Sequence, residues 1–311
     1  MTYTPGPGPD LVIAGSARSG TSFLASVLGT HPRIDPCTVK EPNYFSREFA
    51  RSTDWYDGLF RARQPDLLRL DASMSYTFTH FPHALDRLAE TSPDAYVVYA
   101  VRHPVTRLLS HVQLHRDYFR SETARTLGSA LLSSSVYAGA SAYATWLPRL
   151  EDRFGTDRLL VVPFPVVTGR LDELLDVVCT AVGLAPEPLH QHRDSTGRHR
   201  NQVVEFKGRG VLLGRRAMRR SGLYPAVRRA LGPDRLRRLR TWVTRPVETE
   251  SLVEALATCE EEQHEQLAAL HASAGAAVAD FLVGQDARLG LAWTDDWLDE
   301  CPLPGARGVD W

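Results

Sequence analysis

The sequence predicts a three-layer α/β fold with a central parallel sheet and a helical C-terminal extension. Short apolar runs of strand length alternate with segments of helical periodicity over the first part of the chain. The first apolar run enters a helix through a small, glycine-containing turn, and the last third of the chain carries helical patterns. Strands that alternate with helices predict a parallel sheet covered on both faces.

The predicted strands are apolar runs bounded by polar or glycine-containing turns, and they span residues 11–15, 67–71, 95–101 and 158–163. The first strand ends in Gly15, and the helix after it ends at Gly29, a residue type that is common at helix C-termini. The predicted helices have apolar residues at helical spacing and span residues 23–29, 82–91, 105–118, 137–154 and 171–183.

Three parts follow from these patterns. Residues 1–10 form a Pro/Gly-rich leader that we expect to be disordered, and residues 11–210 form the core. Residues 211–311 form a helical extension packed on this core, with Arg-rich helices over about 208–244 and a long acidic amphipathic helix over 248–282. These charge runs are either solvated helix faces or a guiding surface for anionic ligands.

The composition is that of an ordinary globular protein. With 311 residues, of which 43% are hydrophobic and 23% charged, one sizeable domain is expected. A net charge of -1 argues against a protein that coats nucleic acid. The four cysteines form no CxxC pair or Cys/His ligand cluster in the sequence, so we expect reduced, packing thiols. Without a long apolar run or a signal-peptide pattern, we expect a cytoplasmic protein with no membrane span.

The turn after the first strand has the spacing of a phosphate-binding loop, Gly15-Ser16-Ala17-Arg18-Ser19-Gly20-Thr21-Ser22. Backbone N–H groups at a helix N-terminus converge on an anion, and the hydroxyls of Ser19, Thr21 and Ser22 add donors. The loop makes the predicted fold P-loop-like, although a purely structural turn is the alternative. Because Thr21 stands where nucleotide triphosphatases have lysine, that class of enzyme is disfavoured.

Two further motifs follow along the chain. The first, Lys40-Glu41-Pro42-Asn43-Tyr44-Phe45, reads in isolation as an exposed ion pair before a proline. The second is an apolar strand that runs into Arg102, a helix-starting proline and Ser110. By itself this second motif is an ordinary strand-to-helix junction, but Arg102 supplies a bidentate fork for phosphate and Ser110 one hydroxyl donor.

Together, these motifs resemble those of the sulfotransferases that use 3'-phosphoadenosine-5'-phosphosulfate (PAPS), in the branch of bacterial and heparan-sulfate-type enzymes. The resemblance covers about residues 11–185. It implies that Arg18 and the Ser19-Gly20-Thr21-Ser22 loop hold the 5'-phosphosulfate, with Arg18 neutralising charge in the transition state. It also implies that Arg102 and Ser110 hold the 3'-phosphate, and that Glu41 is the general base that takes the acceptor's proton.

The acceptor side of the sequence departs from the family pattern. Asp71-Ala72-Ser73-Met74-Ser75-Tyr76 occupies the place of a segment that often reads acidic-x-Ser-Pro-x-Tyr. The heparan branch has a lysine there, which is absent here, and Met74 replaces the usual proline. The basic loop over 193–209 is where the family often closes a flap over the nucleotide. Arg198, Arg200 and Lys207 are the flap candidates, and a solvated basic loop is the alternative.

The resemblance thus implies direct, in-line sulfuryl transfer from PAPS to a hydroxyl or amine, with 3',5'-bisphosphoadenosine (PAP) as product. No metal is needed, because the loop and the arginines supply positive charge. The expected acceptor is a small molecule, lipid or natural-product scaffold in a bacterial cell. The alternatives are a nucleotide-dependent phosphotransferase that uses the same loop and a non-catalytic protein that binds an anionic partner.

Overall fold

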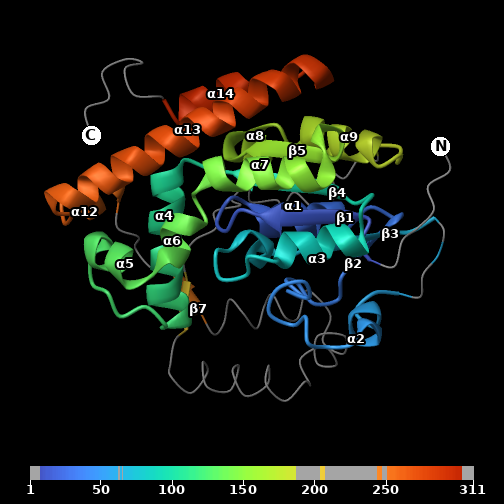
Figure 1. The fold of residues 1–311 in the computed structure, drawn as a ribbon, viewed down its shortest axis with the longest axis horizontal. Helices are drawn as coiled ribbons and strands as arrows, with labels where there is room; N and C mark the ends of the chain where they lie inside the picture. The colour runs from blue at the N-terminus through green and yellow to red at the C-terminus, as the bar shows by residue number, and fades with distance from the viewer. Residues whose placement is uncertain are drawn as a thin grey trace.

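A computed structural model of the chain describes residues 8–61, 64, 66–186, 204–206, 244–246 and 251–302. Its centre is a five-stranded sheet of strand order β2-β3-β1-β4-β5, in which every pair of neighbouring strands is parallel (Figure 1). The strands are β1 (Leu11–Gly15), β2 (Ile34–Pro36), β3 (Leu68–Ala72), β4 (Tyr96–Val101) and β5 (Leu159–Pro163). The predicted parallel sheet is confirmed.

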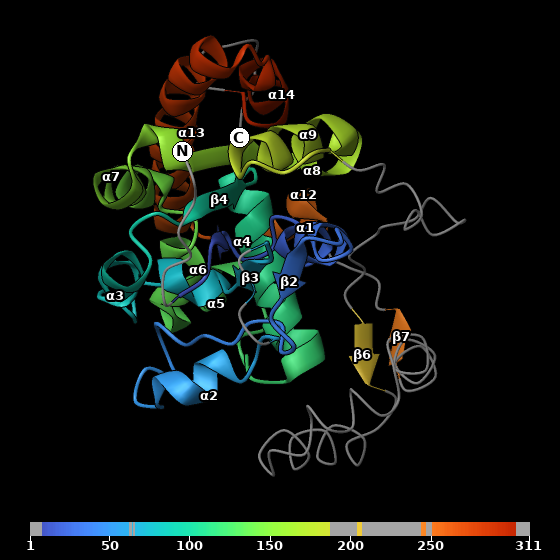
Figure 2. The ribbon, with the colours of Figure 1, turned by 90° about the vertical axis from the view of Figure 1, so that its right-hand side faces the viewer.

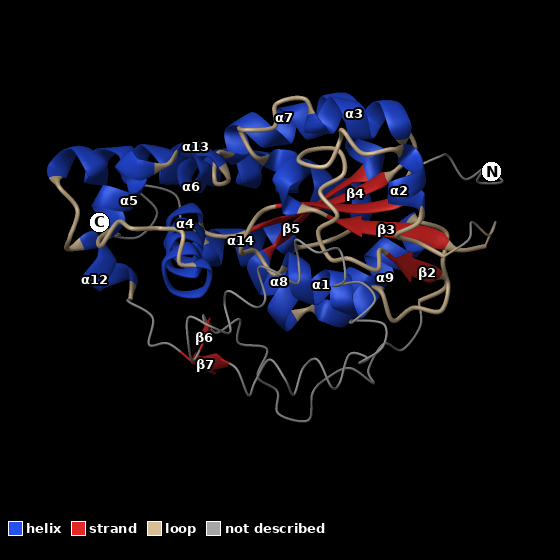
Figure 3. Ribbon diagram, turned by 90° about the horizontal axis from the view of Figure 1, so that it is seen from below, coloured by secondary structure: helices blue, strands red, loops and turns tan. Residues whose placement is uncertain are grey.

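Helices cover both faces of this sheet, as the sequence predicts. Figures 2 and 3 show α3 and α7 on one face and α1, α8 and α9 on the other. The helices near the sheet are α1 (Thr21–Leu28), α3 (Ala84–Thr91), α4 (Pro104–Gln113), α7 (Tyr143–Phe154), α8 (Phe164–Gly169) and α9 (Leu171–Ala181). The remaining helices are α2 (Thr53–Asp57), α5 (Leu127–Ser133), α6 (Ser135–Gly139), α12 (Leu252–Leu256), α13 (Glu261–Leu289) and α14 (Trp293–Glu300).

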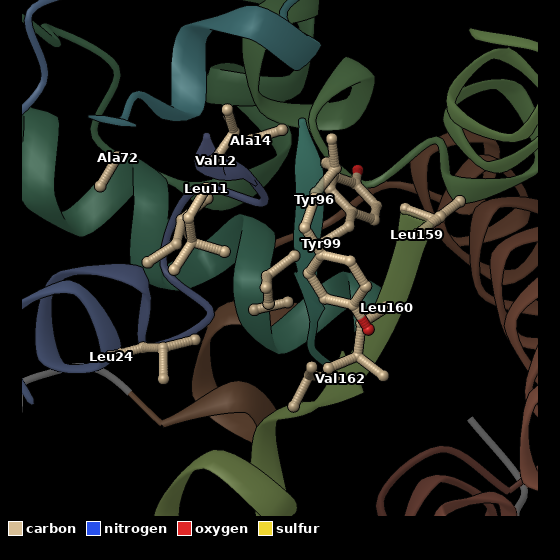
Figure 4. Close-up of a cluster of buried hydrophobic side chains, with 14 of the residues drawn as sticks. Leu11, Val12, Ala14, Leu24, Ala72, Tyr96, Tyr99, Leu159, Leu160 and Val162 are labelled. Carbon is tan, nitrogen blue, oxygen red and sulfur yellow. The ribbon is translucent and has the colours of Figure 1, made fainter. Parts of the chain in front are cut away.

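The core lies between the sheet and its helices. The side chains of β1 from Leu11 to Ala14 are fully buried, as are those of β4 from Val97 to Val101. Figure 4 shows Leu11 of β1, Leu24 of α1 and Val162 of β5 in this core. Strands buried on both faces must be apolar throughout, which is why the sequence shows them as continuous runs rather than as alternating patterns.

Two predicted helices differ from the structure, and one strand of the sheet was not predicted. The predicted helix over 137–154 is two helices, α6 and α7, separated by a short turn. The predicted helix over 105–118 is α4 followed by one π-helical turn, Leu114–Phe119. Strand β2 is absent from the predicted set because three residues are too few to show a pattern.

The C-terminal part is helical, but it is divided differently from the prediction. In place of one helix over 248–282 there are α12 and α13, and α13 continues to Leu289. The Arg-rich helices predicted over 208–244, apart from the three residues of β7, and most of the leader lie outside the described residues. The short strands β6 (Val204–Phe206) and β7 (Thr244–Pro246) pair antiparallel.

Helix α13 packs along the fold and closes one edge of the sheet. It contacts α7, α14, α4 and the edge strand β5. The side-chain amide of Gln285 accepts a hydrogen bond from Val161 N at 2.8 Å and donates one to Val161 O at 2.9 Å. Gln285 is buried and thus satisfies backbone groups of β5 that have no further strand beside them.

Among the described residues, α13 is also the one helix long and apolar enough to cross a membrane. In its most apolar window, 39% of the helix is buried inside the fold. The core helices of globular proteins share this length and composition, so α13 is weak evidence for a membrane span.

Candidate active site

The carboxyl ends of the parallel strands bring the predicted motifs to one edge of the sheet. The loop after β1 lies at the centre of this edge, because β1 lies between β3 and β4. Arg102 follows β4, Ser73 follows β3, and the Lys40–Asn43 segment follows β2, the neighbour of β3. In open parallel sheets, ligands bind outside the carboxyl ends of the strands.

The loop between β1 and α1 is held in shape from both ends. Gly20, the residue before α1, has φ +84°, and a Cβ atom there would lie 2.9 Å from Val167 Cγ1, so this position requires glycine. Ser16 Oγ donates to Ala100 O at 2.9 Å and lies 2.6 Å from Ser19 Oγ. The turn is therefore fixed to β4 before any ligand binds.

The predicted donors of this loop differ in exposure. Ser22 is exposed, whereas Ser19 and Thr21 are buried, and the Ser19 hydroxyl is already in contact with Ser16. The first N–H groups of an α-helix have no acceptor within the helix, so the start of α1 offers donors and a partial positive charge to an anion. Of the three hydroxyl donors, Ser22 is therefore the exposed one, and Ser19 is part of the framework of the loop.

Arg18 links the loop to the second phosphate motif. It adopts a left-handed backbone conformation with φ +73°, and its Nε donates to Ser110 Oγ at 2.9 Å. Arg102 Nη1 in turn donates to Arg18 O at 3.3 Å. Residues that lie 84 and 92 positions apart in the sequence are therefore in direct contact.

Arg102 is held in place through its backbone and its side chain. The Tyr143 hydroxyl donates to Arg102 O at 2.8 Å and accepts from Arg102 N at 3.1 Å. The Arg102 guanidinium carbon lies 4.7 Å from the centre of the Phe164 ring, a cation–π contact. The side chain is thus aligned at the end of β4, where the predicted 3'-phosphate would bind.

A third arginine, Arg107 on α4, was not singled out from the sequence. It is fully buried and donates to the backbone oxygens of Ala17 and Tyr137 and to Ser141 Oγ. The contact with Ala17 O is 3.1 Å long and lies in the phosphate loop itself. Arg107 therefore supports the loop through its hydrogen bond to Ala17 and adds a third positive charge to the site.

Burial lowers the pKa of all three guanidinium groups, those of Arg18, Arg102 and Arg107. Burial lowers the pKa of Arg18 to about 10, and the charges of Arg102 and Arg107 act in the same direction. Burial also lowers the pKa of Arg107 to about 10, with a further lowering from Arg102. Within the described part of the chain, none of the three forms an ion pair with a carboxylate. Such a cluster favours the binding of an anion.

The predicted base, Glu41, lies in a tight turn after β2. It is left-handed, with φ +59°, and its carboxylate forms an ion pair with Lys40. The side chain of Glu41 is 26% exposed and therefore accessible to a small molecule. A hydrogen bond of 3.1 Å from Asn43 N to Ser73 Oγ joins this turn to the residue after β3.

Asp71, which the sequence placed only in a departing motif, is a fully buried carboxylate next to this turn. It accepts hydrogen bonds from Ser73 Oγ at 2.7 Å, Tyr56 OH at 2.8 Å and Tyr76 OH at 2.6 Å. Burial raises the pKa of Asp71, the three hydroxyl donors oppose that rise, and the charge of Glu41 adds to it. The two carboxylates therefore lie near enough to interact.

Comparison with known proteins identifies this arrangement. Residues 8–157, which hold β1 to β4 and all the motifs above, match the family model described as "Sulfotransferase domain". This segment is a sulfotransferase domain. The resemblance to sulfotransferases seen in the sequence is therefore confirmed over this segment.

The curated relatives of this sulfotransferase domain include animal and amoebal proteins. Mouse heparan sulfate glucosamine 3-O-sulfotransferase 6 is 33% identical over 109 residues, 34% of this chain and 31% of that protein. A membrane-associated sulfotransferase of Dictyostelium discoideum is 30% identical over 103 residues, 33% of this chain and 22% of that protein. The chain thus spans less than a third of the length of these curated relatives.

One solved structure supports the fold of the sulfotransferase domain. A sulfotransferase from Alicyclobacillus acidocaldarius superposes with a TM-score of 0.52 at 24% identity. The match covers 58% of this chain and 83% of that one. The flap candidates of the sulfotransferase, Arg198, Arg200 and Lys207, lie outside the described residues, and their role stays a prediction.

The C-terminal helices bring a further acid to the segment that follows β4, next to Arg102 and His103. Glu300, at the end of α14, accepts a hydrogen bond from the backbone N–H of His103 and interacts electrostatically with Arg102. The rings of His103 and His271 lie 4.7 Å apart, and Cys301 Sγ lies 3.6 Å from His271 Nδ1. His103 Nδ1 accepts hydrogen bonds from Val105 N at 3.3 Å and Thr106 N at 3.4 Å, so the ring caps the start of α4.

Glu300 is expected to make folding stability depend on pH. Burial raises its pKa from 4.5 to about 7, against the opposing effects of Arg102 and the His103 N–H. The folded state then binds the proton more tightly, so stability falls as the pH rises from 4.5 to about 7. We expect the urea midpoint of the wild type to fall more between about pH 5 and about pH 8 than that of Glu300→Gln. Glu265→Gln, an exposed acid on α13, is the control, and parallel curves for Glu300→Gln and the wild type would contradict the assignment.

Proposed function

We propose that this chain is an enzyme that transfers a sulfuryl group from PAPS to a hydroxyl or amine of a small-molecule, lipid or natural-product acceptor. The observation that carries the proposal is the cluster of Arg18, Arg102 and Arg107 around the loop after β1, none of which forms an ion pair with a carboxylate among the described residues. A nucleotide with phosphate groups at both ends supplies the missing negative charge.

Two parts of the site would hold the two ends of PAPS. The amides at the start of α1 and Arg18 would hold the phosphosulfate, and Arg102 with Ser110 would hold the 3'-phosphate. Because Arg18 Nε contacts Ser110 Oγ, the two parts lie side by side in the structure. ATP has no 3'-phosphate, so this second part would select PAPS over ATP.

The reaction would be an in-line displacement at sulfur. The acceptor oxygen or nitrogen attacks sulfur while the bond from sulfur to the bridging phosphate oxygen breaks. That oxygen leaves with the electron pair as part of PAP, and Glu41 takes the proton from the acceptor. Arg18 and the loop amides stabilise the charge that develops on the bridging and sulfonate oxygens.

The nucleotide class can be tested without knowledge of the acceptor. Thermal unfolding of the purified protein is measured with PAP, with AMP, and with ATP plus magnesium. A ligand at about 100 times its Kd adds about 2.7 kcal/mol of stability, enough for a shift of a few degrees. We expect a shift with PAP and a smaller one or none with the other two.

Other outcomes would change the proposal. A shift with ATP and magnesium alone would support a phosphotransferase, against which Thr21 in place of lysine argues. The absence of a shift with all three nucleotides would contradict both enzyme classes and favour a protein that binds a different anion.

A further inference from the structure

The turn that carries Glu41 has an unfavourable backbone conformation. Glu41 has φ +59° and Asn43 has φ +54°, and Pro42 lies between them. A left-handed conformation costs a residue with a side chain about 1–2 kcal/mol, and asparagine tolerates it better than glutamate. Such a turn persists only where neighbouring groups hold it in place.

Three of the hydrogen bonds that Asn43 makes hold the turn on the Glu41 side. Its backbone N–H donates to Ser73 Oγ at 3.1 Å, and its side-chain oxygen accepts from Ser75 Oγ at 2.6 Å. Its Nδ2 donates to Glu41 O at 2.7 Å, which closes the turn around Pro42. The position of the Glu41 backbone therefore depends on two serines that follow β3.

The Asp71 carboxylate sets the direction of this chain of hydrogen bonds. An ionised carboxylate only accepts hydrogen bonds, so the Ser73 hydroxyl must point its proton at Asp71 Oδ1, 2.7 Å away. The lone pairs of Ser73 Oγ are then left for the Asn43 N–H. Tyr56 and Tyr76 both donate to the other oxygen, Oδ2, and so fix the orientation of the carboxylate.

Ring packing fixes the same turn from its other end. The ring of Tyr44 stacks on that of Tyr56 with centroids 4.4 Å apart and an interplanar angle of 12°. Phe45 meets Tyr76 edge to face at 5.5 Å. The two tyrosines that donate to Asp71 are thus the ones that support the residues after the turn.

We propose that Asp71 is a positioning residue: through Ser73 and Asn43 it fixes the left-handed turn that carries Glu41, and so sets the direction from which the Glu41 carboxylate reaches the acceptor. This inference rests on the proposed role of Glu41 as base. Asp71 touches neither donor nor acceptor, since it is fully buried.

The test compares Ser73→Ala and Ser73→Thr with the wild type. Turnover is measured with radiolabelled PAPS and a panel of phenols and primary alcohols, and amide hydrogen exchange is measured over the turn. We expect Ser73→Ala to lower kcat by about 10-fold or more with little change in KM for PAPS, because a small misplacement of a catalytic group is costly. Exchange at the Asn43 amide should rise, and Ser73→Thr, which keeps the hydroxyl, should restore both values.

Asp71→Asn tests the origin of the effect, since an amide no longer dictates the direction of the Ser73 hydroxyl. We expect it to lower kcat like Ser73→Ala while the thermal shift with PAP is retained. Ser251→Ala is the matched control: it removes a hydrogen bond of the same length, 3.2 Å, from Glu254 N to a serine that caps α12, a helix that takes no part in the turn.

The outcomes separate this inference from the proposed function. Wild-type kcat and exchange in Ser73→Ala would overturn the positioning role even if Glu41→Gln is inactive. Full turnover in Glu41→Gln would instead overturn the choice of base. A lower melting temperature with unchanged kcat in both Ser73→Ala and Asp71→Asn would reduce Asp71 to a purely structural role.

Discussion

Glu41→Gln is expected to lower kcat by about 10²–10⁴-fold, the range found when a general base is removed. The amide keeps the shape of the side chain but cannot take the acceptor's proton. Glu41 lies on the turn after β2, outside the arginine cluster, so binding of PAP should be unchanged. The measurement is turnover of PAPS under saturating donor, with the thermal shift by PAP recorded in parallel.

Glu48→Gln serves as the control for Glu41→Gln. Glu48 is a neighbouring acid that forms an exposed ion pair with Arg51, and its replacement should leave kcat near the wild-type value. Activity retained in Glu41→Gln would place the base elsewhere, and loss of the PAP shift would show that Glu41 acts on the nucleotide.

Arg102→Leu is expected to weaken PAP binding by about 10²-fold while it changes AMP binding much less. Hydrogen bonds to charged groups contribute about 1.5–3 kcal/mol each, and a loss of about 2.7 kcal/mol corresponds to a factor of 10². Because AMP has no 3'-phosphate, it cannot lose that contact. Isothermal titration with both nucleotides gives the two ratios.

Arg149→Leu is a matched control for Arg102→Leu. Arg149 also lies over an aromatic ring, that of Trp146 at 5.1 Å, but it is on α7, where its guanidinium donates to Pro82 O. Its loss should leave both affinities unchanged. Equal weakening of PAP and AMP in Arg102→Leu would assign Arg102 to the part of the nucleotide that the two ligands share.

The parts of the fold that the sequence revealed are those with a strong local signal. Strand β1 was predicted with its observed bounds, because a buried strand ending in glycine before a helix is a distinct pattern. The three-residue strand β2 gave no such pattern and forms through pairing with β3. The break between α6 and α7 was missed because apolar spacing continues across it, and the turn is set by contacts such as Ser141 Oγ to Pro104 O.

The residues of the candidate site also fall into those with a local sequence signal and those without one. The loop, Glu41, Arg102 and Ser110 lie in short motifs that can be read locally, and the structure brings their segments to one edge of the sheet. The role of Arg107 could not be read, because its acceptors Ala17 and Tyr137 lie 90 and 30 residues away. The role of Asp71 could not be predicted either, because Tyr56, one of its hydroxyl donors, lies 15 residues away. A single acid before a small residue does not reveal which hydroxyl groups surround it in the fold.

The amide of Gln285 has a consequence for how the molecule behaves in a crowded solution. A sheet that ends in bare backbone invites a strand from another chain to add to it, which is one route to aggregation and to unwanted partners. By accepting from Val161 N and donating to Val161 O, this side chain acts as a one-residue substitute for a sixth strand. The sheet therefore ends at β5, and recruitment of a foreign strand on that side would first require α13 to be pulled away.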